Sequence, residues 1–327
     1  MPRGRLTLVA LLGAVALAAP GTARAHLRTG KVAVDYRADV SPLEPPLSGA
    51  VAVRIYRSDL AVRLSSRGRD EIVVLGYLGE PMLRIQPAGV EVASTSPTAA
   101  GAGLLKGTRV AAHGWRFLTR AQTVVWHDAR LRGLPRGVER RRWTIPLVLD
   151  GQRLRLDGAI WRARAPPLWP GAVVGAVFLA LTALLLAPRR KPLLRTATVA
   201  LGTTAAGATL ITAIGFAASS TASQGRWIEA GDEIVFVLVG LAVVVRGSRI
   251  ARALAGGALG LLGLAVGLTK LPVLLHGVVL SALPSLAARS AVVLAISAGA
   301  AATILGLVVF FEILEQYDEP ARLRSGL

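Results

Sequence analysis

Long apolar segments fill the C-terminal half of the chain and constrain its fold more than any other feature. They begin after Pro166-Pro167, where the composition changes abruptly. A helix that crosses a bilayer needs about 20 predominantly apolar residues. Six segments approach this length: 168–187, 196–218, 229–246, 251–269, 271–288 and 290–312. The fourth and fifth are separated only by "TKLP", which is compatible with a tight hairpin or a re-entrant pair. The sequence therefore predicts an α-helical transmembrane bundle of about six helices over 167–312, followed by a polar tail over 313–327.

The first 25 residues have the three parts of a secretory signal peptide. Arg3 and Arg5 give a positive start, and an apolar stretch too short to span a bilayer follows. Ala23-Arg24-Ala25 then matches a small-x-small cleavage site. The alternative is an uncleaved N-terminal anchor. Cleavage would place residues 26–166 outside the cytoplasmic membrane of a bacterium.

The charges between the apolar segments favour the same topology. If the first helix runs inward, eight Lys and Arg residues lie on the cytoplasmic side and only Arg226 and Lys270 lie outside. Positive charges accumulate in cytoplasmic loops, so this asymmetry supports the assignment. Six crossings would return the acidic tail "EILEQYDEP" to the outside. Losing one weak crossing would invert the tail.

Residues 26–166 have the pattern of an antiparallel β domain. Apolar residues alternate from Val51 to Ile55 and from Leu60 to Leu64 around Ser58-Asp59, which is typical of a hairpin. A second hairpin is expected around Asp150-Gly151. The segment "STSPTAAGAGLLKGTR" is small and Gly-rich, and we expect a long exposed loop there. About 140 residues of short strands fit one immunoglobulin-like antiparallel β-sandwich.

The charge of this domain restricts its partners. Between His26 and Pro166 there are 23 Lys and Arg residues against 12 Asp and Glu residues, spread along the expected strands. Nucleic-acid binding would need a compact basic patch on a soluble domain, and a leader argues against it. A basic domain facing outward fits anionic membrane lipid, wall polymers or an envelope protein partner better.

A copper site is the sharpest chemical hypothesis. The chain has no cysteine and four histidines, and none of the histidines forms a close pair with metal-ligand spacing. Cleavage after Ala25 would give His26 a free α-amine beside its imidazole. With His127 as a second ligand, these nitrogens would suit Cu(II), and Asp128 would be a second-shell residue or alternate ligand. The alternative is that both histidines are incidental. His113 is expected in a loop.

Several segments carry a resemblance to known proteins: "KVAVDYRADVSPLEPPLSGAVAVRI", "VLGYLGEPMLRI", "VVWHDARL" and "WTIPLVLDG". Together with the helices that follow, they resemble a family of uncharacterised actinobacterial multi-pass membrane proteins. That family's Gly-Tyr-x-Gly-Glu-Pro motif matches residues 76–81, but its Trp-His-Asp-His-Arg motif has Ala129 here in place of the second histidine. The architecture is also similar to CopC–CopD copper proteins. That similarity implies Cu(II) on the N-terminal histidine and a later histidine, for copper uptake or resistance.

Other polar residues have competing interpretations. Glu80 is expected to pair with Arg84 across a turn, although it could also bind a ligand or partner. His276 is expected within the fifth apolar segment, where an ionisable residue suggests function. The acidic residues from Glu229 to Glu233 suit a helix N-terminus, or alternatively a mouth that attracts cations. No enzyme signature is present. The leading hypothesis is therefore envelope copper handling, and the alternative is an envelope structural or interaction protein.

Overall fold

A computed structural model describes residues 32–56, 61–105, 114–131, 133–187, 191–219 and 224–325. The predicted signal peptide, His26 and His113 lie outside these residues. The described chain divides into two compact units. The sheet unit comprises Ala33–Pro166 and His276–Leu280, and the helical unit contains Pro167–Leu275 and the chain from Ser281 onward.

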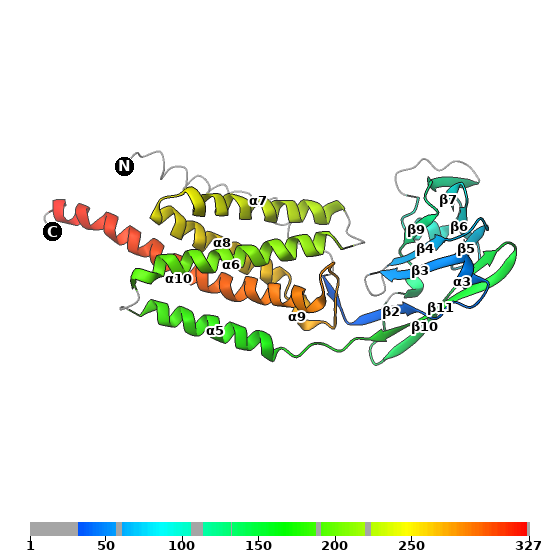
Figure 1. The fold of residues 1–327 in the computed structure, drawn as a ribbon, viewed down its shortest axis with the longest axis horizontal. Helices are drawn as coiled ribbons and strands as arrows, with labels where there is room; N and C mark the ends of the chain where they lie inside the picture. Colours follow the sequence, from blue (N-terminus) through cyan, green and yellow to red (C-terminus); the bar gives the residue numbers. More distant parts are fainter. Residues whose placement is uncertain are drawn as a thin grey trace. The chain divides into compact units, whose positions relative to one another are not determined.

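Two antiparallel sheets make up most of the sheet unit (Figure 1). The larger sheet has the order β2 (Tyr36–Val40), β11 (Gln152–Arg162), β10 (Arg140–Leu149), β5 (Ile72–Leu75), β6 (Pro81–Gln86), β7 (Gly89–Ala93) and β8 (Trp115–Thr119). The smaller sheet has the order β3 (Val51–Tyr56), β4 (Ala61–Ser66) and β9 (Thr123–Trp126). The connections contain the short helices α3 (Leu47–Ala50), α4 (Pro97–Gly101) and η1 (Ala129–Leu131). The antiparallel β structure expected for this region is confirmed.

One hydrophobic core joins the two sheets. On β10, Trp143, Ile145, Leu147 and Leu149 are buried, whereas Arg142 and Thr144, on either side of Trp143, are exposed. The core also contains Ile72 and Leu83 of the larger sheet and Leu64 and Trp126 of the smaller one. Because side chains alternate across a strand, Arg142 and Thr144 occupy the opposite face of the larger sheet.

Both predicted hairpins are present. Val51 pairs with Ser66 and Ile55 with Val62. At the second hairpin, Leu149 pairs with Gln152, and the two turn residues have positive φ: 46° for Asp150 and 83° for Gly151. A two-residue turn of this type matches the twist of the strands that it joins. The exposed loop expected at 94–109 is wrong in its first part, where α4 forms and Ser96, Thr98 and Ala99 are buried.

A short strand from the C-terminal half completes the sheet unit. β12 (Val278–Val279) pairs antiparallel with β1 (Ala33–Val34). His276 belongs to this segment, and its Nδ1 lies 2.9 Å from Asp35 Oδ1. An intramembrane position for His276 in a fifth helix is therefore wrong.

The helical unit contains five long helices among the described residues: α5 (Trp169–Leu186), α6 (Lys191–Ala217), α7 (Gln224–Arg246), α8 (Arg249–Thr269) and α10 (Ser285–Ser325). Four of them, α5, α6, α8 and α10, are long and apolar enough to cross a membrane. The expectation of six helices is not confirmed, because 271–288 folds as α9 (Pro272–Leu275), β12, a loop and the start of α10. The polar tail from residue 313 continues α10 as helix.

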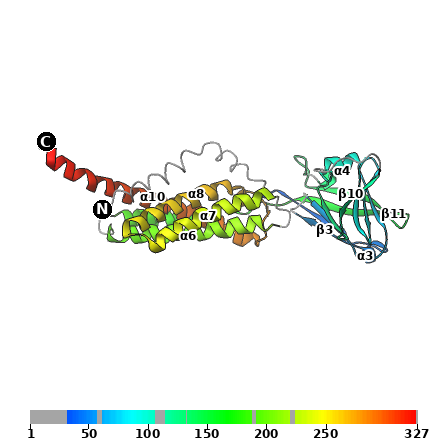
Figure 2. The same cartoon turned by 90° about the horizontal axis from the view of Figure 1, so that it is seen from above.

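Small residues bring these helices close together (Figure 2). A Cβ added to Gly202 of α6 would lie 2.1 Å from the carbonyl oxygen of Gly256 on α8. A Cβ on Gly257 of α8 would lie 3.0 Å from Cα of Gly306 on α10. Close backbone approach of this kind is how small residues serve membrane helices. The Gly- and Ala-rich stretches of α6 and α8 therefore serve helix packing.

Candidate functional site

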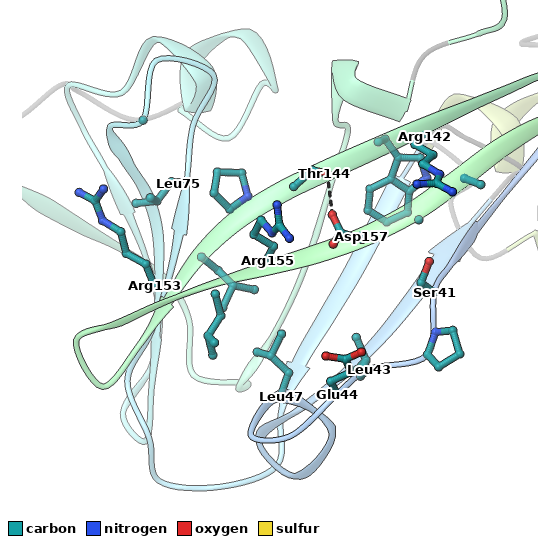
Figure 3. A pocket seen from close by; sticks show the side chains of 18 of the residues that line it. Ser41, Leu43, Glu44, Leu47, Leu75, Arg142, Thr144, Arg153, Arg155 and Asp157 are labelled. Carbon is teal, nitrogen blue, oxygen red and sulfur yellow. Dashed lines mark hydrogen bonds between the residues drawn. The ribbon is translucent and has the colours of Figure 1, made fainter.

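A cavity of about 1270 Å³ lies in the sheet unit. Three parts of the chain line it: the β10–β11 hairpin, residues 41–47 after β2, and residues 75–79 after β5. Figure 3 shows Arg153 and Arg155 on the hairpin, with Leu43 and Glu44 on the segment after β2. This volume exceeds the range of roughly 300–1,000 Å³ that is common for small-molecule sites. We call the cavity the hairpin groove.

Four arginines line the hairpin groove. Arg140 and Arg142 come from β10, and Arg153 and Arg155 come from β11. All four are exposed, and within the described part of the chain none of their side chains has a hydrogen-bond or ion-pair partner. Residues two apart on a strand point to the same face, roughly 7 Å from one another. The arginines therefore form two pairs, both available to an external anion.

Two acidic residues also line the groove, Glu44 and Asp157. Asp157 is opposite Thr144 in the hairpin, and the Thr144 hydroxyl donates a hydrogen bond of 2.6 Å to its Oδ1. With four arginines against two carboxylates, the lining has a net charge of +2. Its electrostatics favour an anionic ligand.

Apolar side chains form another part of the same lining. Leu43, Leu75 and Leu154 are partly buried, and Leu78 is 81% exposed. An exposed leucine beside unpaired arginines gives the groove both an apolar and a cationic wall. Such a combination matches a ligand that has both characters.

Trp143 forms the base of the hairpin and allows no side chain opposite it. Gly158 is its partner across the ladder, and an added Cβ there would lie 2.1 Å from Cζ2 of Trp143 and 2.3 Å from the Asp39 carbonyl oxygen. The Trp143 Nε1 is buried without a hydrogen-bond partner in the described structure. Gly158 is therefore required for β2, β10 and β11 to pack as they do.

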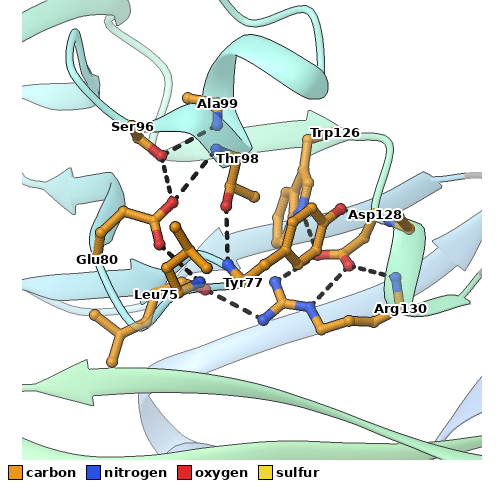
Figure 4. Close-up of polar contacts among 11 residues, drawn as sticks. Leu75, Tyr77, Glu80, Ser96, Thr98, Ala99, Trp126, Asp128 and Arg130 are labelled. Atoms are coloured by element: carbon orange, nitrogen blue, oxygen red, sulfur yellow. Dashed lines mark hydrogen bonds and ion pairs between the residues drawn. The ribbon is translucent and has the colours of Figure 1, made fainter.

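A hydrogen-bond network holds the turn that carries Leu78 (Figure 4). Glu80 accepts hydrogen bonds from the Ser96 hydroxyl at 2.9 Å, the Leu78 amide at 3.0 Å and the Thr98 amide at 3.3 Å. Gly76 makes room for this carboxylate, because an added Cβ would lie 2.0 Å from Glu80 Oε1. The expected Glu80–Arg84 pair is wrong, since Arg84 pairs with Glu91 on β7.

This network also fixes the charge of Glu80. Partial burial raises the pKa of the Glu80 carboxyl, but the hydrogen bonds from Thr98, Ser96 and nearby backbone amides lower it more, to about 2. Glu80 is therefore ionised at neutral pH and serves to cap the turn and α4. The contacts of Glu80 are therefore those expected if the Gly-Tyr-x-Gly-Glu-Pro motif forms a turn between two strands.

A buried ion pair supports the same turn from the other side. The Asp128 side chain is fully buried and accepts hydrogen bonds from Arg130 Nε at 2.8 Å, Arg130 Nη2 at 2.7 Å and Trp126 Nε1 at 2.9 Å. Arg130 also donates to the carbonyl oxygen of Leu75 at 3.3 Å, and its guanidinium lies 5.0 Å from the centre of the Tyr77 ring. The Trp-His-Asp segment thus positions the wall of the groove.

The predicted copper ligands are not brought together among the described residues. His127 is exposed immediately after β9, whereas the neighbouring Asp128 is buried and already bound by Arg130. No group of three potential metal ligands occurs in the described part of the chain. His26 lies outside it. The copper site stays a prediction that depends on His26.

The acidic residues of α7 have a different role from the one expected. The helix begins at Gln224, so its first turn carries no acidic residue, and the favoured helix-dipole interpretation is wrong. Glu233 lies in the helix interior, and Lys270 Nζ donates to its two carboxylate oxygens at 2.9 and 2.8 Å. The Lys270 side chain is 5% exposed. This pair fastens α7 to the end of α8.

Comparisons with known protein families, curated proteins and solved structures found no match to this chain.

The groove arginines were not among the residues singled out from the sequence. The general excess of basic residues was the available signal, but it did not distinguish these four from arginines elsewhere. Their common face follows from the register of the hairpin, in which Arg142 pairs with Ala159 and Arg155 with Pro146. The alternation along "RRRWTIPLVL" and the position of the turn at Asp150-Gly151 together predict that register.

Proposed function

We propose that this chain is an integral membrane protein of the bacterial envelope, with its sheet unit outside the cytoplasmic membrane. We propose that the sheet unit binds anionic lipid through the arginines of the hairpin groove. The observation that carries this proposal is that Arg140, Arg142, Arg153 and Arg155 are exposed and unpaired within the described structure. Unpaired arginines attract anionic headgroups and release counter-ions on binding.

We propose a topology with five crossings, one more than the four helices that are long and apolar enough to cross a membrane. α7 has 23 residues, long enough for a bilayer core of about 30 Å, and it packs against α6 and α8. In this topology seven Lys and Arg residues of the α5–α6 and α7–α8 connections and adjoining helix ends are cytoplasmic, and Arg226, Lys270 and Arg289 are outside. Arg289 would be cytoplasmic with six crossings and is outside with five, but the excess of Lys and Arg on the cytoplasmic side remains. The sheet unit and β12 are then on the outer side, and the C-terminal tail is cytoplasmic.

This role agrees with an interaction protein of the envelope and requires no metal. The copper hypothesis is a separate proposal that needs a free His26 amine near His127. Asp128 gives it little support, because four donors from Arg130 and Trp126 already bind its carboxylate.

Vesicle flotation tests the proposal on the full-length protein in nanodiscs of neutral phosphatidylcholine. We expect the protein to float with vesicles that contain phosphatidylglycerol and not with vesicles of phosphatidylcholine alone. The variant R153Q/R155Q should lose most of this binding. Its matched control is R69Q/R120Q, which removes two exposed arginines that lie outside the groove lining. An equal loss of vesicle binding in both variants would show that binding depends only on net charge and would contradict a specific site.

A further inference from the structure

The groove differs from a purely cationic surface because its lining continues into apolar side chains. We propose that it holds one anionic amphiphile, with a phosphate head on Arg153 and Arg155 and an aliphatic chain against the leucines. This inference rests on the proposed function and narrows it. A membrane surface would need only the arginines, whereas a single amphiphile needs both walls of the cavity.

The position of the arginines supports a head at this end of the groove. Arg153 and Arg155 are two apart on β11, so their guanidinium groups can approach one phosphate together. Neither has an intramolecular partner in the described chain that a ligand would have to displace. Leu75 also lines the cavity, and Figure 3 shows it together with Arg153 and Arg155.

The position of Leu78 supports an aliphatic chain. It lines the cavity with 81% of its surface exposed, although the burial of an apolar side chain is favourable. Glu80 and Ser96 hold its turn rigidly, so Leu78 does not owe its exposure to a loose loop. Leu43 extends the apolar wall on the opposite segment. The cavity of about 1270 Å³ is large enough for a chain as well as a head.

Photo-crosslinking tests this inference. The probe is lysophosphatidic acid with a diazirine in its acyl chain, added to the full-length protein in phosphatidylcholine nanodiscs. Labelled peptides are mapped by mass spectrometry. We expect labels on peptides that contain residues 41–47 and 75–79. Unlabelled lysophosphatidic acid should compete, whereas lysophosphatidylcholine and inorganic phosphate should compete poorly.

Two variants separate the head from the chain. R153Q/R155Q and L78D should each reduce labelling of these peptides several-fold. The controls R69Q/R120Q and V125D should leave it unchanged, because Val125 is exposed on β9 outside the groove lining. Leu78 is a surface residue, so its replacement leaves the core intact. The thermal unfolding of each variant confirms that it is folded.

The outcomes distinguish this inference from the broader proposal. Flotation with anionic vesicles without labelling of the groove would overturn the amphiphile site and leave the proposed function standing. Equal competition by lysophosphatidylcholine would overturn the role of the arginines, and equal competition by inorganic phosphate would overturn the role of the chain. Groove labelling that L78D and R153Q/R155Q both weaken supports the inference, even if intact vesicles do not bind.

Discussion

The Arg130 guanidinium donates two hydrogen bonds to the buried carboxylate of Asp128, from Nε at 2.8 Å and from Nη2 at 2.7 Å. The same guanidinium reaches the carbonyl oxygen of Leu75, which lines the hairpin groove. Asp128 is therefore connected through one side chain to the wall of the proposed site. This relationship gives the Trp-His-Asp segment a structural role that is independent of copper.

Replacing Asp128 by Asn should destabilise the sheet unit by about 3 kcal/mol, because breaking a buried pair leaves the remaining charge uncompensated. Tryptophan fluorescence during thermal unfolding measures this, since four of the six tryptophans lie in the sheet unit. The control is E139Q, which breaks the exposed Arg162–Glu139 pair of 3.5 Å and should cost under about 1 kcal/mol. Equal effects in the two variants would contradict the structural role of Asp128.

Glu80 should make the sheet unit sensitive to acid. Its pKa is about 2 in the folded protein, below its ordinary value of 4.5. The stabilisation from its ionised form is therefore complete above about pH 4.5 and is lost as the pH falls toward 2. We expect E80Q to lower the unfolding temperature at pH 7, with a difference from wild type that shrinks over this range. A difference that stays constant from pH 7 to pH 3 would show that the charge of Glu80 contributes nothing.

Gly158→Ala should disturb the base of the groove. The added methyl group would overlap both Trp143 and the Asp39 carbonyl oxygen, and the second contact is with backbone that cannot rotate away. Overpacking of this kind costs about 1–3 kcal/mol. We predict a lower unfolding temperature and an altered Trp fluorescence spectrum. Gly49→Ala is the control, because nothing lies within 4 Å of its added Cβ.

The copper hypothesis makes a prediction that differs from lipid binding. Cu(II) titration of the processed full-length protein should show tight one-to-one binding that both H26A and H127A abolish. The lipid proposal expects H127A to float with anionic vesicles as wild type does, because His127 does not line the groove. Copper binding that survives H26A would contradict the predicted ligand set. An isolated fragment that ends at Pro166 is unsuitable for this test, since it lacks β12.

Local patterns in the sequence were sufficient for much of the fold. Alternation around Asp150-Gly151 correctly placed the longest hairpin, because period and turn chemistry act over neighbouring residues. The segment 271–288 misled because it is predominantly apolar. Gly277 and Pro284 interrupt it, and Val278–Val279 pairs with β1 about 240 residues earlier in the chain. A long-range pairing of two residues leaves no periodic signal.

The candidate site was less accessible than the fold. Its lining comes from residues 41–47, 75–79 and 140–159, which only the assembled sheet brings together. The Glu80–Arg84 expectation failed for a related reason. Arg84 lies opposite Glu91 in the β6–β7 ladder, so a cross-strand partner replaced the neighbour in sequence.

The salt dependence of binding to anionic vesicles tests the central proposal most directly. Full-length protein and R153Q/R155Q are compared with phosphatidylglycerol vesicles over a series of ionic strengths. The account predicts tight binding by the wild type that weakens with salt, and weaker binding with a shallower salt dependence for R153Q/R155Q but not for R69Q/R120Q. Binding that is indifferent to salt, or equal for all three proteins, would contradict it.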